Sequence, residues 1–125
     1  MARDIRFWRD ENNHLAFDAE KLSPAWTVGQ WLLDDVQGSG LGLLKVLDGV
    51  AHQPYETSGN AWFAKVDGDQ VTLENHFNDN LTATVPLDTA LEILRAYWDA
   101  LGEEAISEGR AYFLKYEKRQ PNLPW

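Results

Sequence analysis

The chain contains no cysteine. This absence excludes a disulfide framework, a thiolate nucleophile and a cysteine-based zinc site, so packing has to stabilise the fold. Basic residues are also few, since eleven Lys and Arg stand against twenty Asp and Glu, for a formal net charge of -9. A negative field of this kind repels nucleic acid and anionic membranes and speeds encounter with basic partners. Plain solubility is the alternative explanation of the same charge.

Long hydrophobic runs are absent as well. No segment approaches the roughly 18 apolar residues that a membrane span needs. The N-terminal segment MARDIRFWRDE has no apolar signal core, so we expect a soluble cytoplasmic protein without a membrane partner. The 125 residues fit one domain, and their 44% hydrophobic content with six Trp argues against a disordered acidic chain.

The negative charge is concentrated in the middle of the chain. Residues 48–108 contain twelve acids and only two basic residues, a net charge of -10, whereas residues 110–125 carry +3. The sequence therefore predicts an acidic body with a mildly basic tail.

Hydrophobic periodicity predicts an α+β fold in a single domain, residues 1–125. An N-terminal hairpin is expected, with Phe7 opposite Leu15 and Ile5 opposite Phe17. In the first helical segment, LSPAWTVGQWLLDDV, Thr27 and Gln30 have the spacing of a capping box. Further helices are expected over 41–52 and within PLDTALEILRAYWDALG, residues 86–102, a loop over 53–59, helix or strand over 103–119, and an irregular end over 120–125.

The strongest pattern lies in NAWFAKVDGDQVTLENHFNDNLTATV, residues 60–85, which predicts a three-stranded antiparallel meander. Two turns set its register: a two-residue turn at Asp67 and Gly68, and a loop at 78–80. The resulting pairs are Ala64 with Val71, Trp62 with Leu73, Leu73 with Val85, Asn75 with Ala83 and Phe77 with Leu81. Both turns bury the same face, so the meander and the hairpin are expected to pack against three to four helices.

No motif for catalysis or metal binding stands out. The three histidines lack the spacing of a zinc site, and Ser39 in GSG is neither a nucleophile elbow nor a phosphate loop. Asp67, Asp69 and Glu74 resemble part of a calcium loop but lack its third acidic position and its final glutamate. We therefore expect no catalytic residue, no metal and no cofactor.

The segments WLLDDV, GNAWFAKVDGDQVTLEN and VPLDTALEILRAYWDAL, in that order, resemble small bacterial immunity proteins of polymorphic toxin systems, including the contact-dependent growth inhibition type. The resemblance lies in size, acidity and a small sheet-plus-helix build, and no family residue is carried onto a numbered position. It implies a protein that binds and neutralises a cognate toxin domain. Nuclease toxins are usually basic, and an acidic inhibitor can cover such a surface by charge complementarity.

The expected partner-binding residues are acids of the turns, the exposed sheet face and the first helix, with one tryptophan outside the predicted core. They are Asp67, Asp69, Glu74, Asp79, Asp34, Asp35 and Trp26. One alternative is a small enzyme or ligand-binding module with a site between sheet and helices, using His76, Glu74 and Tyr55. Another is a structural adaptor that docks through residues 110–125. A deep polar cleft would favour the enzyme, and a flat acidic face would favour the inhibitor.

Overall fold

The computed structural model describes residues 4–125, and it confirms the expected α+β class. A two-stranded and a four-stranded antiparallel sheet, four α-helices and one π-helical turn make up this part of the chain. In order they are β1 (Ile5–Arg9), β2 (Leu15–Ala19), α1 (Pro24–Trp31), the π-helical turn η1 (Leu32–Val36), α2 (Gly40–Ala51), β3 (Tyr55–Ser58), β4 (Trp62–Asp67), β5 (Gln70–Asn75), β6 (Thr82–Pro86), α3 (Leu87–Leu101) and α4 (Glu103–Glu117).

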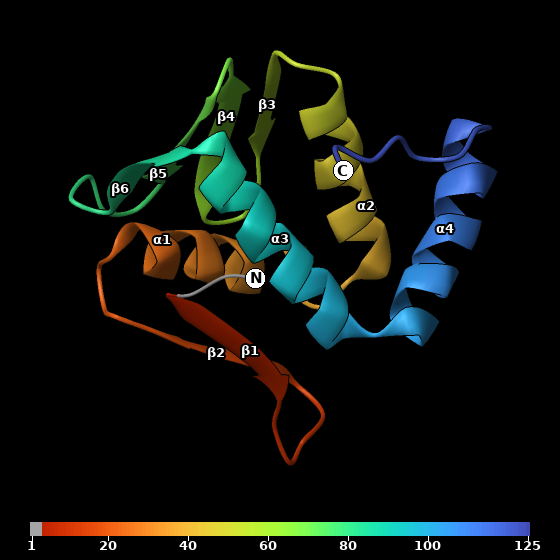
Figure 1. Ribbon diagram of the computed structural model, residues 1–125, viewed down its shortest axis with the longest axis horizontal. Coiled ribbons are helices and arrows are strands. Elements are labelled where there is room, and N and C mark those ends of the chain that lie inside the picture. Colours follow the sequence, from red (N-terminus) through yellow and green to blue (C-terminus); the bar gives the residue numbers. More distant parts are fainter. Residues whose placement is uncertain (1–3) are drawn as a thin grey trace.

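The helices lie between the hairpin and the larger sheet and also form one side of the molecule (Figure 1). The sheet has the order β3-β4-β5-β6; α1 and α3 contact β5 and β6, and α2 contacts β3. The β1–β2 hairpin packs on α1 and α3, while α4 lies outside α2, away from the sheet (Figure 1). Within the described chain, no helix is long and apolar enough to cross a bilayer.

The core forms on the helix-facing side of the larger sheet, where alternate residues of β4, β5 and β6 point inward. Trp62, Ala64 and Leu73 have no exposed surface, and Val66, Val71 and Val85 are at most 2% exposed. Burying this strip leaves the opposite face of the sheet open to solvent.

Every predicted strand register is displaced by two residues. Ala64 pairs with Leu73 and Leu73 pairs with Ala83, and in the hairpin Phe7 pairs with Phe17. Because side chains alternate with a period of two, an even displacement keeps the same residues on the buried face. The predicted pairs are wrong although the predicted faces hold for β4 and β5.

Turn geometry explains the displacement. The β4–β5 turn is centred on Gly68 and Asp69, one residue later than predicted, with Gly68 at φ 64° as a type II′ turn requires at its first central position. In the hairpin, the Asp10 carboxylate accepts hydrogen bonds from the backbone N–H groups of Asn12 and His14, which makes the loop longer than expected.

Two other expectations for the larger sheet are wrong. The segment expected as a loop contains β3, because pairing with β4 satisfies its backbone and places Tyr55 on the inner face beside Gly49 of α2. Phe77, expected on the buried face, is 81% exposed. The ladder of β5 ends at Asn75, whose side-chain oxygen accepts hydrogen bonds from the backbone N–H groups of Phe77 and Asn78 and turns the chain away from the core.

The structure changes one expectation for the helices and decides another. The first helix begins at Pro24 with Ser23 as its cap, in place of the predicted Thr27–Gln30 capping box, because proline suits the first helical position and Ser23 Oγ accepts the Trp26 N–H. Of the two alternatives left open for residues 103–119, the structure has the helix, over Glu103–Glu117.

Candidate partner-binding surface

Four of the predicted acids lie on the solvent-exposed side of the larger sheet or in its turns. Asp67 and Asp69 flank Gly68 in the β4–β5 turn, Glu74 lies on the outer face of β5, and Asp79 lies in the β5–β6 loop. All four are exposed, and the hydrogen bonds and ion pairs among residues 4–125 do not include their carboxylates. Their charges are therefore available to another molecule.

The strand β5 divides these four acids into two pairs. Asp67 and Asp69 lie at one end of the strand, and Glu74 and Asp79 lie at or beyond the other. Glu74 is five positions after Asp69 along extended chain, a distance of about 17 Å. A globular protein partner can reach both ends, because a standard interface covers about 800 Å² on each side.

The outer face between the two pairs is mostly polar. Cross-strand neighbours align Glu56, Lys65, Thr72 and Thr84 in one row and Ser58, Phe63, Glu74 and Thr82 in the next. Phe63 is half-buried, and its neighbours Ser58, Glu74 and Thr82 are exposed. The face is thus open and has one aromatic side chain between polar ones.

Asp34 and Asp35 lie in the π-helical turn η1, and their carboxylates bind the start of β4 in the larger sheet. The Asp35 carboxylate accepts hydrogen bonds from the backbone N–H groups of Ala61 and Trp62, at 2.9 and 3.1 Å. Asp34 Oδ2 accepts the Trp62 indole N–H at 2.9 Å, and its Oδ1 accepts from Gln30. Both acids are half-buried, so the structure brings them into the fold and separates them from the four free acids.

Trp26 also lies apart from the free acids. It is half-buried on α1, which packs under the sheet against β5 and β6 and beside the hairpin. Its position on the helix side of the molecule places it across the core from the outer sheet face.

The three residues of the enzyme alternative do not form one site. Tyr55 points to the inner face of β3, where burial raises the pKa of its hydroxyl, whereas Glu74 lies on the outer face of β5. His76 Nε2 lies 3.0 Å from the Ser58 hydroxyl, on an exposed surface. Among residues 4–125, no group of three or more His, Asp or Glu side chains is placed to hold a metal ion.

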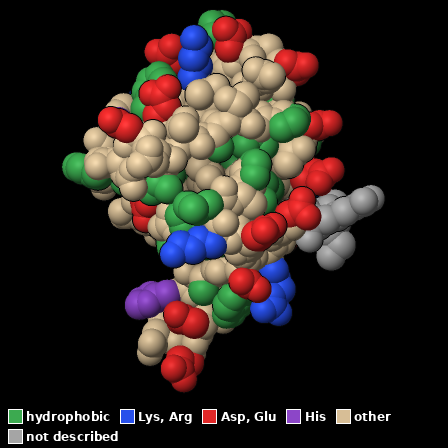
Figure 2. All heavy atoms as spheres, turned by 90° about the vertical axis from the view of Figure 1, so that its left-hand side faces the viewer, with side chains coloured by type: hydrophobic (Ala, Val, Ile, Leu, Met, Phe, Trp, Pro, Cys, Tyr) green, Lys and Arg blue, Asp and Glu red, His purple; other side chains and the backbone are tan. Residues whose placement is uncertain are grey.

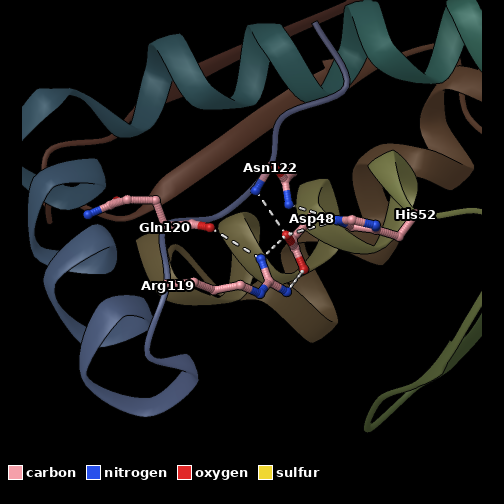
Figure 3. A network of polar contacts seen from close by, with 5 residues as sticks. All are labelled: Asp48, His52, Arg119, Gln120 and Asn122. Atoms are coloured by element: carbon pink, nitrogen blue, oxygen red, sulfur yellow. Dashed lines mark hydrogen bonds and ion pairs between the residues drawn. The ribbon is translucent and has the colours of Figure 1, made fainter.

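The C-terminal tail is bound to the body of the protein through Asp48 on α2 (Figure 3). Arg119 donates to both carboxylate oxygens of Asp48 at 2.8 Å, and the Asn122 backbone N–H donates to Oδ1 at 2.9 Å. His52 Nε2 lies 2.8 Å from Asn122 Nδ2 and 3.8 Å from Asp48 Oδ1. Trp125 contacts Trp98 of α3 edge to face, so the aromatic end of the predicted docking tail packs on the body of the protein, although Trp125 stays 41% exposed.

This network gives a pH prediction. Hydrogen bonding from Arg119 lowers the pKa of Asp48 to about 2 in the folded protein, from 3.8. The ionised Asp48 therefore stabilises the fold fully at pH values above the pKa of the unfolded chain, and this contribution is lost as the pH falls through about 2. Asp48→Asn should reduce the free energy of unfolding at pH 7 by about 1–2 kcal/mol, a modest figure because Arg119 is partly solvated. The difference from wild type, measured by urea unfolding, should shrink between pH 4 and pH 2.

Glu104→Gln is the control for the Asp48 variant, because Glu104 is exposed on α4. Its difference from wild type should stay within about 0.5 kcal/mol at every pH. An Asp48→Asn effect that did not change on acidification would contradict the assigned role of the carboxylate.

Comparison with protein-family models, with curated proteins and with solved structures finds no significant match.

The sequence pattern predicted the exposure of Asp67, Asp69 and Asp79 from the turns and that of Glu74 from strand alternation, but it did not predict Phe77 as a surface residue. Strand alternation favoured an inward Phe77, and the contrary signal was the asparagine two positions earlier, since Asn side chains readily bond to the backbone two residues on.

Proposed function

We propose that the protein is a cytoplasmic immunity protein that binds and neutralises a basic bacterial toxin domain through its outer sheet face. The observation that supports this most is the set of four exposed acids whose carboxylates have no hydrogen-bond or ion-pair partner among residues 4–125: Asp67, Asp69, Glu74 and Asp79. Such carboxylates attract a cationic surface and accelerate its association. The outer face offers a broad, open contact area. Inhibition by covering a toxin surface needs no catalytic residue.

Net charge alone does not select this face. Acidic side chains are scattered over the side of the molecule seen in Figure 2, with fewer basic ones among them. A test therefore has to separate local charge from total charge. Two variants with four charge reversals each do so, because they have the same net charge.

The first variant replaces Asp67, Asp69, Glu74 and Asp79 by lysine. The second replaces four exposed acids away from the outer sheet face, Asp18, Glu20, Glu104 and Glu108. The first should slow association with the toxin domain by about tenfold or more and flatten its dependence on salt, whereas the second should have a smaller effect. Stopped-flow association at low and high ionic strength measures both.

The toxin domain for this test is one encoded beside the gene of this chain. Its expression alone should arrest growth, and co-expression with the wild-type chain should restore it. If co-expression does not restore growth, the proposed function is wrong. If both variants reduce the association rate by the same factor, the outer sheet face is not the binding surface.

A further inference from the structure

The β5–β6 loop presents an aromatic side chain to solvent. Phe77 is 81% exposed, the highest value among the exposed large hydrophobic residues of the described chain. Figure 1 shows the loop projecting from the side of the molecule, at the end of the sheet away from α2 and α4. Its ring meets the His76 ring edge to face at 6.4 Å, but little of its apolar surface is buried in the fold.

Hydrogen bonds at the start of the loop and within it hold it in shape. Asn75 Oδ1 accepts from the backbone N–H groups of Phe77 and Asn78, and Asn78 Oδ1 accepts from the N–H of Asn80. The His76 N–H donates to the Ala61 carbonyl at 2.8 Å, which fixes the start of the loop to the segment before β4. A loop ordered before binding loses less conformational entropy when a partner covers it.

Residues at the end of β5, in the β5–β6 loop and at the start of β6 line a hollow of about 300 Å³. It is lined by Glu74, Asn75, Asp79, Leu81 and Thr82. Two of these residues are free acids, and Leu81 is a half-buried apolar residue among them. The volume is at the lower end of the range for small-molecule sites, about 300–1,000 Å³, and suits a single inserted side chain.

We propose that residues 74–82 form the hot spot of the interface, with Phe77 entering an apolar pocket of a basic partner protein. A lysine or arginine beside that pocket enters the hollow between Glu74 and Asp79. Buried aromatic anchors supply most of the affinity at many interfaces, and paired charges at their edge fix the orientation. This inference rests on the proposed function for the nature of the partner, and it adds where the partner binds and what chemistry it presents.

The charges favour a basic protein over a second copy of this chain. A symmetric contact through the same loop would bring Glu74 and Asp79 of two copies together, and each chain has a formal net charge of -9. Like charges at an interface oppose association.

Site-specific photo-cross-linking tests the inference. The cross-linking residue p-benzoylphenylalanine is placed at position 77 in the wild-type background and in a Glu74→Lys, Asp79→Lys background. A third protein has it at position 116, because Tyr116 is an exposed aromatic residue on α4, away from the sheet. Each is irradiated in lysate of the source organism, and cross-linked peptides are identified by mass spectrometry.

The expected result is one basic protein cross-linked from position 77 in the wild-type background, through a segment that contains lysine or arginine. That product should be lost in the Glu74→Lys, Asp79→Lys background and absent from position 116. Titration of the identified protein should then show about 30-fold weaker binding for Phe77→Ala and about twofold or less for Tyr116→Ala.

No product from position 77, the same product from position 116, an acidic partner or a second copy of the chain would each overturn the inference. So would wild-type affinity of Phe77→Ala for the identified protein. The failure of the proposed function is a different outcome: a basic partner cross-linked at position 77 whose expression does not arrest growth.

Discussion

Asp35→Ala is expected to lower the free energy of unfolding by about 3 kcal/mol, although a surface acid is usually worth little. The Asp35 carboxylate accepts two backbone N–H groups, from Ala61 and Trp62, where the chain enters β4. Alanine leaves both donors without their partner, and unsatisfied donors at a half-buried site cost more than the bonds contributed. The side chain of Trp62, one of these two donor residues, is fully buried, so loss of the Asp35 carboxylate also weakens the anchoring of the core.

The matched comparison is Asp67→Ala, because Asp67 is an exposed acid at the other end of the same strand. Urea unfolding should place its free energy within about 0.5 kcal/mol of wild type. Asp35→Asn should be intermediate, since the amide keeps one acceptor oxygen and loses the charge. Equal stability of Asp35→Ala and Asp67→Ala would mean that Asp35 does not hold β4.

The contrast between these two acids shows what the sequence predicts about the site. Residues beside a glycine turn, such as Asp67 and Asp69, are exposed for local reasons that a sequence pattern contains. The partners of Asp35 are 26 and 27 residues further along the chain, and no local pattern connects them. Adjacent acids at the end of a helix therefore predicted a charged surface, whereas the fold uses them as hydrogen-bond acceptors.

The sheet shows the same division between local and long-range information. Hydrophobic alternation predicted which face of β4 and β5 is buried, because burial requires only the period of two. It did not predict the register, because the turn is centred on Gly68 and Asp69 instead of Asp67 and Gly68. The strand β3 was missed since its four residues, YETS, have no clear apolar alternation, and pairing with β4 determines their conformation.

Gly109→Ala is expected to destabilise the protein by about 3 kcal/mol, although alanine favours helix over glycine by about 1 kcal/mol. Gly109 is buried in α4 where this helix crosses the start of α2. A Cβ atom at this position would lie 2.6 Å from the Leu41 backbone nitrogen and would also contact the backbone of Gly40. Backbone atoms cannot rotate away, so the two helices would have to separate.

Gly42→Ala on α2 is the control, because a Cβ atom there would meet its nearest neighbours, Ser39 Cβ and the Val36 carbonyl oxygen, at 3.4 Å. This is ordinary contact, so the helix preference of alanine should dominate and stability should be unchanged or up to about 1 kcal/mol higher. Thermal unfolding of both variants separates the two effects, since they make the same chemical change in helices that pack against each other. If Gly109→Ala proved as stable as Gly42→Ala, the close approach of α2 and α4 would not be required for the fold. The opposite signs expected here follow from tertiary contact alone, because helix propensity predicts the same sign at both positions.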